Sequence, residues 1–206
     1  MALPQQTHQH DANRMTPEEY LAFERNSDER HEYIGGRVYA MTGASRNHNL
    51  IAGNLFAALH GNFRKRPCEV YSETIRVRVD ELDNYVYPDV VALCGEAKFA
   101  DTTYDMLTNP QVIVEVRSPS TKRYDEGGKF DLYRQLDTLR EYLLVSQDVP
   151  HIAHHIRQSD NTWLIRDVVD TDAAIQIATV DVELTLADVY EKVTFETGEN
   201  EKAGDE

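Results

Sequence analysis

The amino-acid sequence predicts an α/β (α+β) fold in which helices flank a mixed central β-sheet. Short apolar runs with strand-like composition recur along the chain and are separated by polar turns. Two stretches instead carry the three-to-four-residue apolar spacing of helices, and the clearer one lies between Ser45 and Arg64. A strand, a helix and a strand also follow one another between residues 112 and 145, which indicates a parallel pair joined by a right-handed crossover.

The composition is that of a soluble globular protein. The 206 residues are 41% hydrophobic and 28% charged, and no run approaches the roughly 18 apolar residues of a membrane span. We expect one domain over residues 14–195, between a flexible leader at 1–13 and an acidic, disordered tail at 196–206. The polar N-terminus does not resemble a signal peptide, and we expect Cys68 and Cys94 to be free thiols. These features predict a cytoplasmic protein that makes no contact with a membrane.

The formal net charge is −15, which argues against nonspecific binding of nucleic acid. Such binding depends on lysine and arginine side chains that displace counterions from phosphates. A local basic patch, or metal ions held by carboxylates, would still allow an acidic protein to contact a nucleic acid.

The N-terminal third predicts a helix, a hairpin and a longer helix. Thr16 and Pro17 start the first helix, since threonine caps helices and proline suits their first position, and we expect it to end near Arg25. Two short runs on either side of Gly35-Gly36 predict a β-hairpin over 32–34 and 37–41. Ser45 then caps a helix to about Arg64, with an apolar stripe formed by Ile51, Leu55 and Leu59. His48 precedes this stripe by one turn, so we expect it to face inward.

The rest of the chain predicts alternating strands and short helices. Alternation indicates strands over 68–79 and 85–93, and a continuous apolar run indicates a third over 112–117. Residues 95–110 should form a loop, and residues 125–137 a helix whose inward positions are Lys129, Leu132, Tyr133 and Leu136. We expect the remaining strands at 141–145, 152–157, 162–169, 174–178 and 182–184, with a helical turn at 186–190.

Two of the apolar runs contain a carboxylate. Asp89 follows Pro88 at the start of Val90-Val91, and Glu115 lies within Val112-Ile113-Val114-Glu115-Val116. An unpaired carboxylate is costly to bury, so each should have a partner. Two or three carboxylates that meet could hold Mg²⁺, which prefers oxygen ligands and keeps several waters. The alternatives are that Asp89 caps a turn and that Glu115 forms a structural ion pair with Arg117 or Lys129.

Several sequence motifs, taken in order, resemble a known family. The pair Pro88-Asp89, followed by Glu115 and a basic residue two positions later, resembles the PD-(D/E)XK nuclease pattern. The wider set is more similar to the Uma-type family of proposed restriction endonucleases, and it runs from about Pro17 to Phe195. It comprises Arg30-His31-Glu32-Tyr33-Ile34-Gly35-Gly36, Pro88-Asp89-Val90-Val91, Glu115-Val116-Arg117-Ser118-Pro119-Ser120-Thr121, Tyr124-Asp125 with Lys129, and Arg140-Glu141-Tyr142.

This resemblance implies a restriction-endonuclease-like core and a phosphodiesterase that acts on DNA with Mg²⁺ or Mn²⁺. Asp89, Glu115 and Lys129 would be catalytic, with Glu32, Asp89 and Glu115 as metal ligands. Arg117 stands where the superfamily pattern has lysine, and its high pKa makes it a poor proton carrier. We therefore assign the lysine role to Lys129 and expect Arg117 to clamp a phosphate or carboxylate. His48 and Asp125 are supporting candidates.

Other hypotheses remain open at this stage. Arg117 and the acidic surface also fit a nuclease fold that only binds or assembles, and the same site could act on RNA or another phosphate ester. Pairing of subunits would allow two strands to be cut, so a homodimer is expected. His154 and His155 could form a zinc site with His151, but strand alternation places these two on opposite faces.

Overall fold

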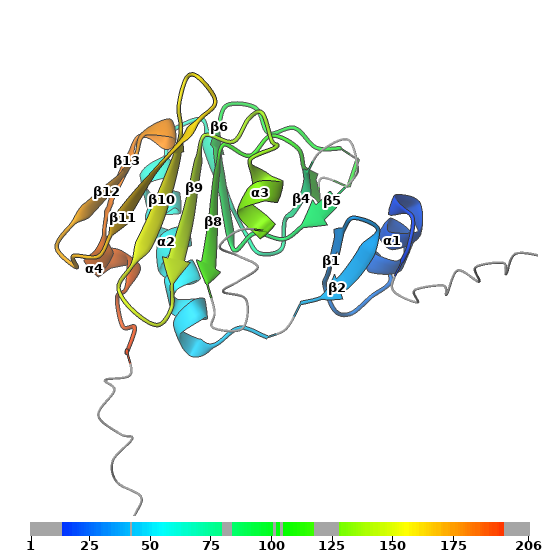
Figure 1. Cartoon of the computed structure of the whole chain (residues 1–206), viewed down its shortest axis with the longest axis horizontal. Coiled ribbons are helices and arrows are strands. Elements are labelled where there is room, and N and C mark those ends of the chain that lie inside the picture. Colours follow the sequence, from blue (N-terminus) through cyan, green and yellow to red (C-terminus); the bar gives the residue numbers. More distant parts are fainter. Residues whose placement is uncertain are drawn as a thin grey trace, which may run out of the picture.

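The computed structural model describes residues 14–41, 43–79, 84–100, 102–103, 105–117 and 128–195. Within them the strands form three sheets (Figure 1). A five-stranded sheet has the order β2-β1-β5-β4-β7, a six-stranded sheet the order β11-β10-β9-β8-β6-β3, and β12 pairs with β13. The expected leader and tail, and Asp125, lie outside the described residues. No helix in the described ranges is long and apolar enough to cross a membrane.

The N-terminal elements confirm the predicted helix and hairpin. Helix α1 (Pro17–Glu24) begins with a capping box, in which Thr16 N–H donates to Glu19 at 2.8 Å and Glu19 N–H donates to the Thr16 hydroxyl at 3.3 Å. Strands β1 (His31–Ile34) and β2 (Arg37–Ala40) pair in antiparallel fashion. Both turn glycines have positive φ, which glycine adopts without strain.

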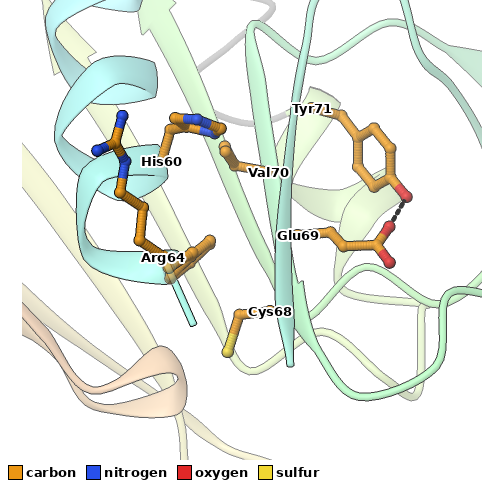
Figure 2. A pocket seen from close by; sticks show the side chains of 7 residues that line it. His60, Arg64, Cys68, Glu69, Val70 and Tyr71 are labelled. Atoms are coloured by element: carbon orange, nitrogen blue, oxygen red, sulfur yellow. Dashed lines mark hydrogen bonds between the residues drawn. The ribbon is translucent and has the colours of Figure 1, made fainter. Parts of the chain in front are cut away.

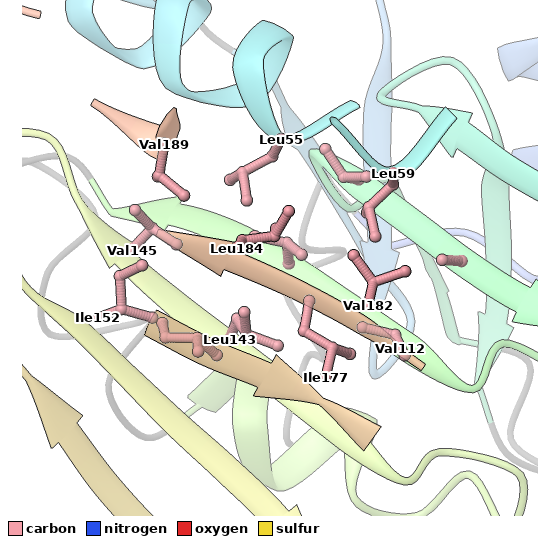
Figure 3. Packing of buried hydrophobic residues seen from close by; sticks show 14 of the residues in the cluster. Leu55, Leu59, Val112, Leu143, Val145, Ile152, Ile177, Val182, Leu184 and Val189 are labelled. Carbon is pink, nitrogen blue, oxygen red and sulfur yellow. The ribbon is translucent and has the colours of Figure 1, made fainter. Parts of the chain in front are cut away.

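Helix α2 (Arg46–Phe63) covers one face of the six-stranded sheet. Ser45 caps it by accepting the His48 N–H at 3.1 Å, and the predicted apolar stripe is buried. The stripe is part of a hydrophobic core that also contains residues of β8 (Val112–Arg117) and β9 (Glu141–Ser146) and of three C-terminal elements, β12 (Ala174–Ile177), β13 (Val182–Thr185) and α4 (Leu186–Val189), as Figure 3 shows. A 3₁₀ turn, η2 (Ala178–Val180), joins β12 to β13. The end of α2 that carries His48 is thereby fixed against the sheet.

Two of the predicted strands are each divided between two sheets. Residues 68–79 form β3 (Cys68–Ser72) and β4 (Arg76–Val79), and residues 84–94 form β5 (Asn84–Val86) and β6 (Val90–Cys94). Pro88 lies at the second break, where a residue that cannot donate to a ladder is tolerated. Asp89 therefore stands immediately before β6, and not inside a strand as we expected.

The predicted parallel pair is confirmed, but the helix between its strands ends earlier than predicted. Strands β8 (Val112–Arg117) and β9 (Glu141–Ser146) are parallel and adjacent, with α3 (Phe130–Tyr133) between them in sequence. After Tyr133 the chain continues in tight turns, because the N–H of Leu136 bonds to Tyr133 O and that of Leu139 to Leu136 O. The expected loop at 95–110 also contains a short strand, β7 (Met106–Leu107).

A second core lies on the face of the six-stranded sheet opposite α2, where helix α3 and the five-stranded sheet contribute to it (Figure 1). It contains Ile113 and Leu144 from the six-stranded sheet, Val77 from β4, and Leu132 and Tyr133 from α3. Strand β8 thus buries Val112, Val114 and Val116 toward α2 and Ile113 toward α3. Glu115, two positions after Ile113, points to the α3 side.

Cys68 and Cys94 form a disulfide, which corrects the expectation of two free thiols. They lie directly opposite each other on the antiparallel strands β3 and β6. Strand register is a tertiary property, so the spacing of the two cysteines in the sequence could not reveal the pairing. Disulfides are rare in reducing compartments, and the pair therefore removes the support that the cysteines gave to a cytoplasmic location.

Strands β10 (Ile152–Arg157) and β11 (Trp163–Val168) confirm two of the predicted strands and pair as an antiparallel hairpin, on which His154 and His155 face opposite sides. His154 Nε2 lies 2.5 Å from a buried carboxylate oxygen of Glu141, whose other oxygen accepts the Thr179 N–H at 2.7 Å. These bonds join η2 to the sheet and give His154 a structural role. Burial raises the pKa of Glu141, but these hydrogen bonds lower it by more. The pKa of Glu141 therefore lies below its usual value.

His155 is buried between Phe130 and Tyr142, whose ring centroids lie 4.4 and 5.4 Å from its own. Burial, aided by the charge of His154 and opposed by Asp167, lowers the pKa of His155 to about 4. Below about pH 6.5 the unfolded chain binds a proton that the folded chain does not, so stability falls as the pH drops toward 4. Between about pH 7 and pH 5, the free energy of unfolding, measured with urea, should fall by about 2 kcal/mol less in His155→Phe than in the wild type.

The exposed His60 provides the control for this change. His60→Phe should leave the pH dependence of stability as it is in the wild type. The same loss in wild type and His155→Phe would contradict the prediction.

Candidate active site

Five segments bring charged side chains together at one end of strands β6 and β8. Glu32 comes from β1, Asp89 from the residue before β6, Glu115 from β8, Lys129 from the residue before α3, and His48 from the first turn of α2. Each of these side chains is at most 13% exposed. All five were candidates from the sequence, and the structure brings them into one connected network.

Asp89 and Glu115 are neighbours across two paired strands. Val90 lies opposite Val114, and the same antiparallel register continued by one step places Asp89 opposite Glu115. Asp89 Oδ2 accepts the Val116 N–H at 2.6 Å and lies 3.3 Å from His48 Nε2. The carboxylate of Asp89 is therefore held against β8 from one side and by α2 from the other.

Lys129 joins two of the carboxylates. Its Nζ lies 3.2 Å from Glu32 Oε1 and 3.2 Å from each carboxylate oxygen of Glu115. Lys129 was expected on the inward stripe of the helix, and its ammonium indeed faces the interior. This contact fits both hypotheses for Glu115, the catalytic one and the structural ion pair, and it identifies Lys129 as an ion-pair partner.

Tyr133 is a part of the site that the sequence interpretation missed. Its buried hydroxyl donates to Glu115 Oε1 at 2.6 Å. The residue had been assigned only to the apolar stripe, although it follows Lys129 by four positions and so shares its helix face. That spacing is the signal that could have found it. Tyr87 N–H similarly donates to Glu32 Oε1, at 3.4 Å.

The electrostatics of the network are dominated by buried negative charge. Burial raises the pKa of Glu115, the ammonium of Lys129 lowers it, and the charges of Asp89 and Glu32 raise it again, so that the result lies well above the usual range. Burial lowers the pKa of His48, but its hydrogen bond and attraction to Asp89 outweigh this effect and raise it overall. Three acidic groups thus face one ammonium and one imidazole, and burial together with the repulsion from Asp89 and Glu32 favours the protonated form of Glu115.

The donor set suits a hard divalent cation in its chemistry. All three carboxylates offer oxygen ligands, and a divalent cation would replace the proton that burial favours on Glu115. Among the described residues, no three His, Cys, Asp or Glu side chains already stand in an arrangement that could hold a metal ion. Mg²⁺ is commonly bound by only one or two carboxylates and several waters, so Asp89 and Glu115 would suffice.

Of the two remaining candidates, Arg117 is the one within the described residues. Arg117 ends β8 and is partly exposed. Burial raises the pKa of Tyr190 to about 12, and its hydrogen bond with His151 and the charge of Arg117 work against that rise. Its role as a clamp stays a prediction. Asp125 lies outside the described residues.

A family model matches the sequence over most of the chain. The model, Uma2, bears the description "Putative restriction endonuclease" and matches residues 17–187, which include Glu32, Asp89, Glu115 and Lys129. The chain belongs to the Uma2 family. The resemblance seen in the sequence motifs is therefore confirmed.

The chain is also similar to two curated proteins and to one solved structure. Two uncharacterised proteins of Synechocystis sp. strain PCC 6803 are similar to the chain. One is 33% identical over 182 residues, which cover 88% of this chain and 94% of the relative. The other is 34% identical over 164 residues, which cover 80% of this chain and 93% of the relative. The crystal structure of a "putative nuclease belonging to DUF820" from Anabaena variabilis superposes with a TM-score of 0.69 at 14% identity, over 85% of this chain and 97% of that one. The predicted nuclease-like α+β fold is thereby confirmed.

Proposed function

We propose that this Uma2-family protein is an endonuclease that hydrolyses phosphodiester bonds in DNA with the help of Mg²⁺ or Mn²⁺. The observation that carries the proposal is the position of Lys129, whose ammonium lies 3.2 Å from Glu115 and from Glu32, beside a buried aspartate. Two acids that can share a cation and one amine beside them are the groups that phosphodiester hydrolysis needs. Membership of a restriction-endonuclease family supports the same reaction.

Each residue of the site has a proposed task. Asp89 and Glu115 would hold the metal, with Glu32 as a third ligand, and the bound metal would activate a water and neutralise charge on the phosphate. The ammonium of Lys129 would orient that water and stabilise the charge that develops on the phosphate oxygens. His48 orients Asp89 through a 3.3 Å contact, and the Tyr133 hydroxyl fixes one oxygen of Glu115.

The test is cleavage of supercoiled plasmid DNA by the wild-type protein. We expect nicked and linear products with Mg²⁺ or Mn²⁺, no products with excess EDTA, and recovery when metal is restored. Glu115→Ala serves as the comparison, because loss of a ligand should remove the metal-dependent products. Equal cleavage by Glu115→Ala and the wild type, or cleavage unaffected by EDTA, would refute the assignment.

A second candidate function is a nuclease-fold module that binds or assembles without turnover. It is favoured by Arg117, which occupies the lysine position of the superfamily pattern, and by the net charge of −15. Titration calorimetry with Mn²⁺ separates the two candidates, since the inert module should give no heat that depends on Asp89. The nuclease proposal also includes a two-fold homodimer that would address both strands, which light scattering can measure.

A further inference from the structure

An exposed arginine lies beside the candidate site, on the same strand as Glu32. Arg30 precedes β1, and its carbonyl accepts the Met41 N–H at 2.9 Å, which continues the β1–β2 ladder by one step. Residues two apart in a strand point the same way and lie about 7 Å apart, so Arg30 shares a strand face with Glu32. The side chain of Arg30 is 42% exposed, whereas that of Glu32 is 9% exposed.

Arg30 is paired with an acidic residue that also borders the site. Its Nη1 lies 3.7 Å from Glu73 Oε1, and the Glu73 side chain is 46% exposed. Ser72 lies opposite Val90, so the turn that begins at Glu73 leaves β3 at the strand end beside which Asp89 stands. Burial lowers the pKa of His48, whereas the interaction with Asp89 and, to a smaller extent, the charge of Glu73 raise it. Arg30 and Glu73 therefore form the outer rim of the network that contains Asp89.

This ion pair is suited to being exchanged. Exposed ion pairs at such separations contribute little to stability, so another anion can replace Glu73 at small cost. A guanidinium binds phosphate oxygens in a planar, two-pronged geometry, and it keeps its charge at all relevant pH values. Glu73, in contrast, would repel a phosphate at the same place.

We propose that Arg30 binds a DNA backbone phosphate next to the one that is cleaved, and that Glu73 competes with that phosphate for Arg30. The inference rests on the proposed nuclease function and adds a named contact between the acidic protein and its polyanionic substrate. It predicts that loss of the Arg30 side chain weakens DNA binding, because the phosphate loses its ligand. Loss of the Glu73 charge strengthens DNA binding, because the phosphate loses its competitor.

The experiment measures the binding of a fluorescent DNA duplex by anisotropy, with Ca²⁺ as the cation and at several salt concentrations. Arg30→Ala should weaken binding roughly tenfold and reduce the salt slope by about one. Glu73→Gln should strengthen binding severalfold, and the double variant should behave like Arg30→Ala. Arg30→Lys, which keeps the charge, should retain part of the affinity.

The matched control is Arg64→Ala, at the far end of α2 from His48. Arg64 is exposed and lines a cavity of about 280 Å³ with His60, Cys68 and Tyr71, as Figure 2 shows. This change should leave the affinity for DNA as it is. If the wild type binds DNA but Arg30→Ala changes neither affinity nor salt slope, the role of Arg30 is refuted and the proposed function stands. If the wild type binds no DNA, both fail. Circular dichroism and thermal melting establish that each variant is folded.

Discussion

Lys129→Met is expected to abolish metal-dependent cleavage while strengthening the binding of Mn²⁺. The ammonium lies 3.2 Å from carboxylate oxygens of both Glu32 and Glu115, so its loss removes the charge proposed to stabilise the reacting phosphate. We expect the cleavage rate to fall at least about 100-fold. The same ammonium repels a divalent cation, and titration calorimetry should therefore show a lower dissociation constant for Mn²⁺ in the variant.

The metal-free variant should also be less stable. Removal of the ammonium leaves the carboxylates of Glu32 and Glu115 without their cationic partner. We expect the free energy of unfolding to fall by about 2–3 kcal/mol, a loss that proton uptake by Glu115 limits. Lys129→Arg restores the charge and should recover much of the stability. Lys192→Met removes a lysine that is 76% exposed and should change none of the three measurements. Cleavage at the wild-type rate in Lys129→Met would show that Lys129 is only a structural partner of Glu115.

The residues that the sequence identified were those whose surroundings contradict their chemistry. Glu115 stood out because four apolar residues surround it in a strand, and Lys129 because it falls on an apolar helix stripe. Both signals are local, since burial follows from periodicity, and burial of a charge requires a partner. The structure confirms that Glu115 is buried, leaves the Lys129 side chain 12% exposed, and shows that they are partners of each other.

The parts that the sequence did not reveal depend on long-range pairing. Alternation continues through residues 68–79, so nothing local shows that Ser72 and Arg76 belong to different sheets. The Cys68–Cys94 disulfide depends on the register between β3 and β6. Glu73 reaches the rim of the site for the same reason, because the turn between the two sheets carries it there.

Glu115→Gln should separate function from stability. Glutamine has the shape of glutamate and keeps an oxygen that can accept the Tyr133 hydroxyl, now 2.6 Å from Glu115 Oε1, but it lacks the charge that would bind a metal. We expect cleavage to fall at least about 100-fold and the calorimetric signal for Mn²⁺ to weaken strongly. The fold should survive, because the change leaves no cavity and relieves the crowding of negative charge around Asp89.

The pH dependence of stability in EDTA gives this prediction a second measurement. Burial, with the charges of Asp89 and Glu32 and against the opposing effects of Lys129 and the Tyr133 hydrogen bond, raises the pKa of Glu115 to about 8. Between its usual value near 4.5 and this raised value, the folded protein binds a proton that the unfolded chain does not, so stability falls as the pH rises. Glu115→Gln cannot titrate and should lose this slope, while Asp131→Asn, at an exposed carboxylate in α3, should keep it. An unchanged slope in Glu115→Gln, or full cleavage activity, would show that Glu115 is neither the titrating group nor a metal ligand.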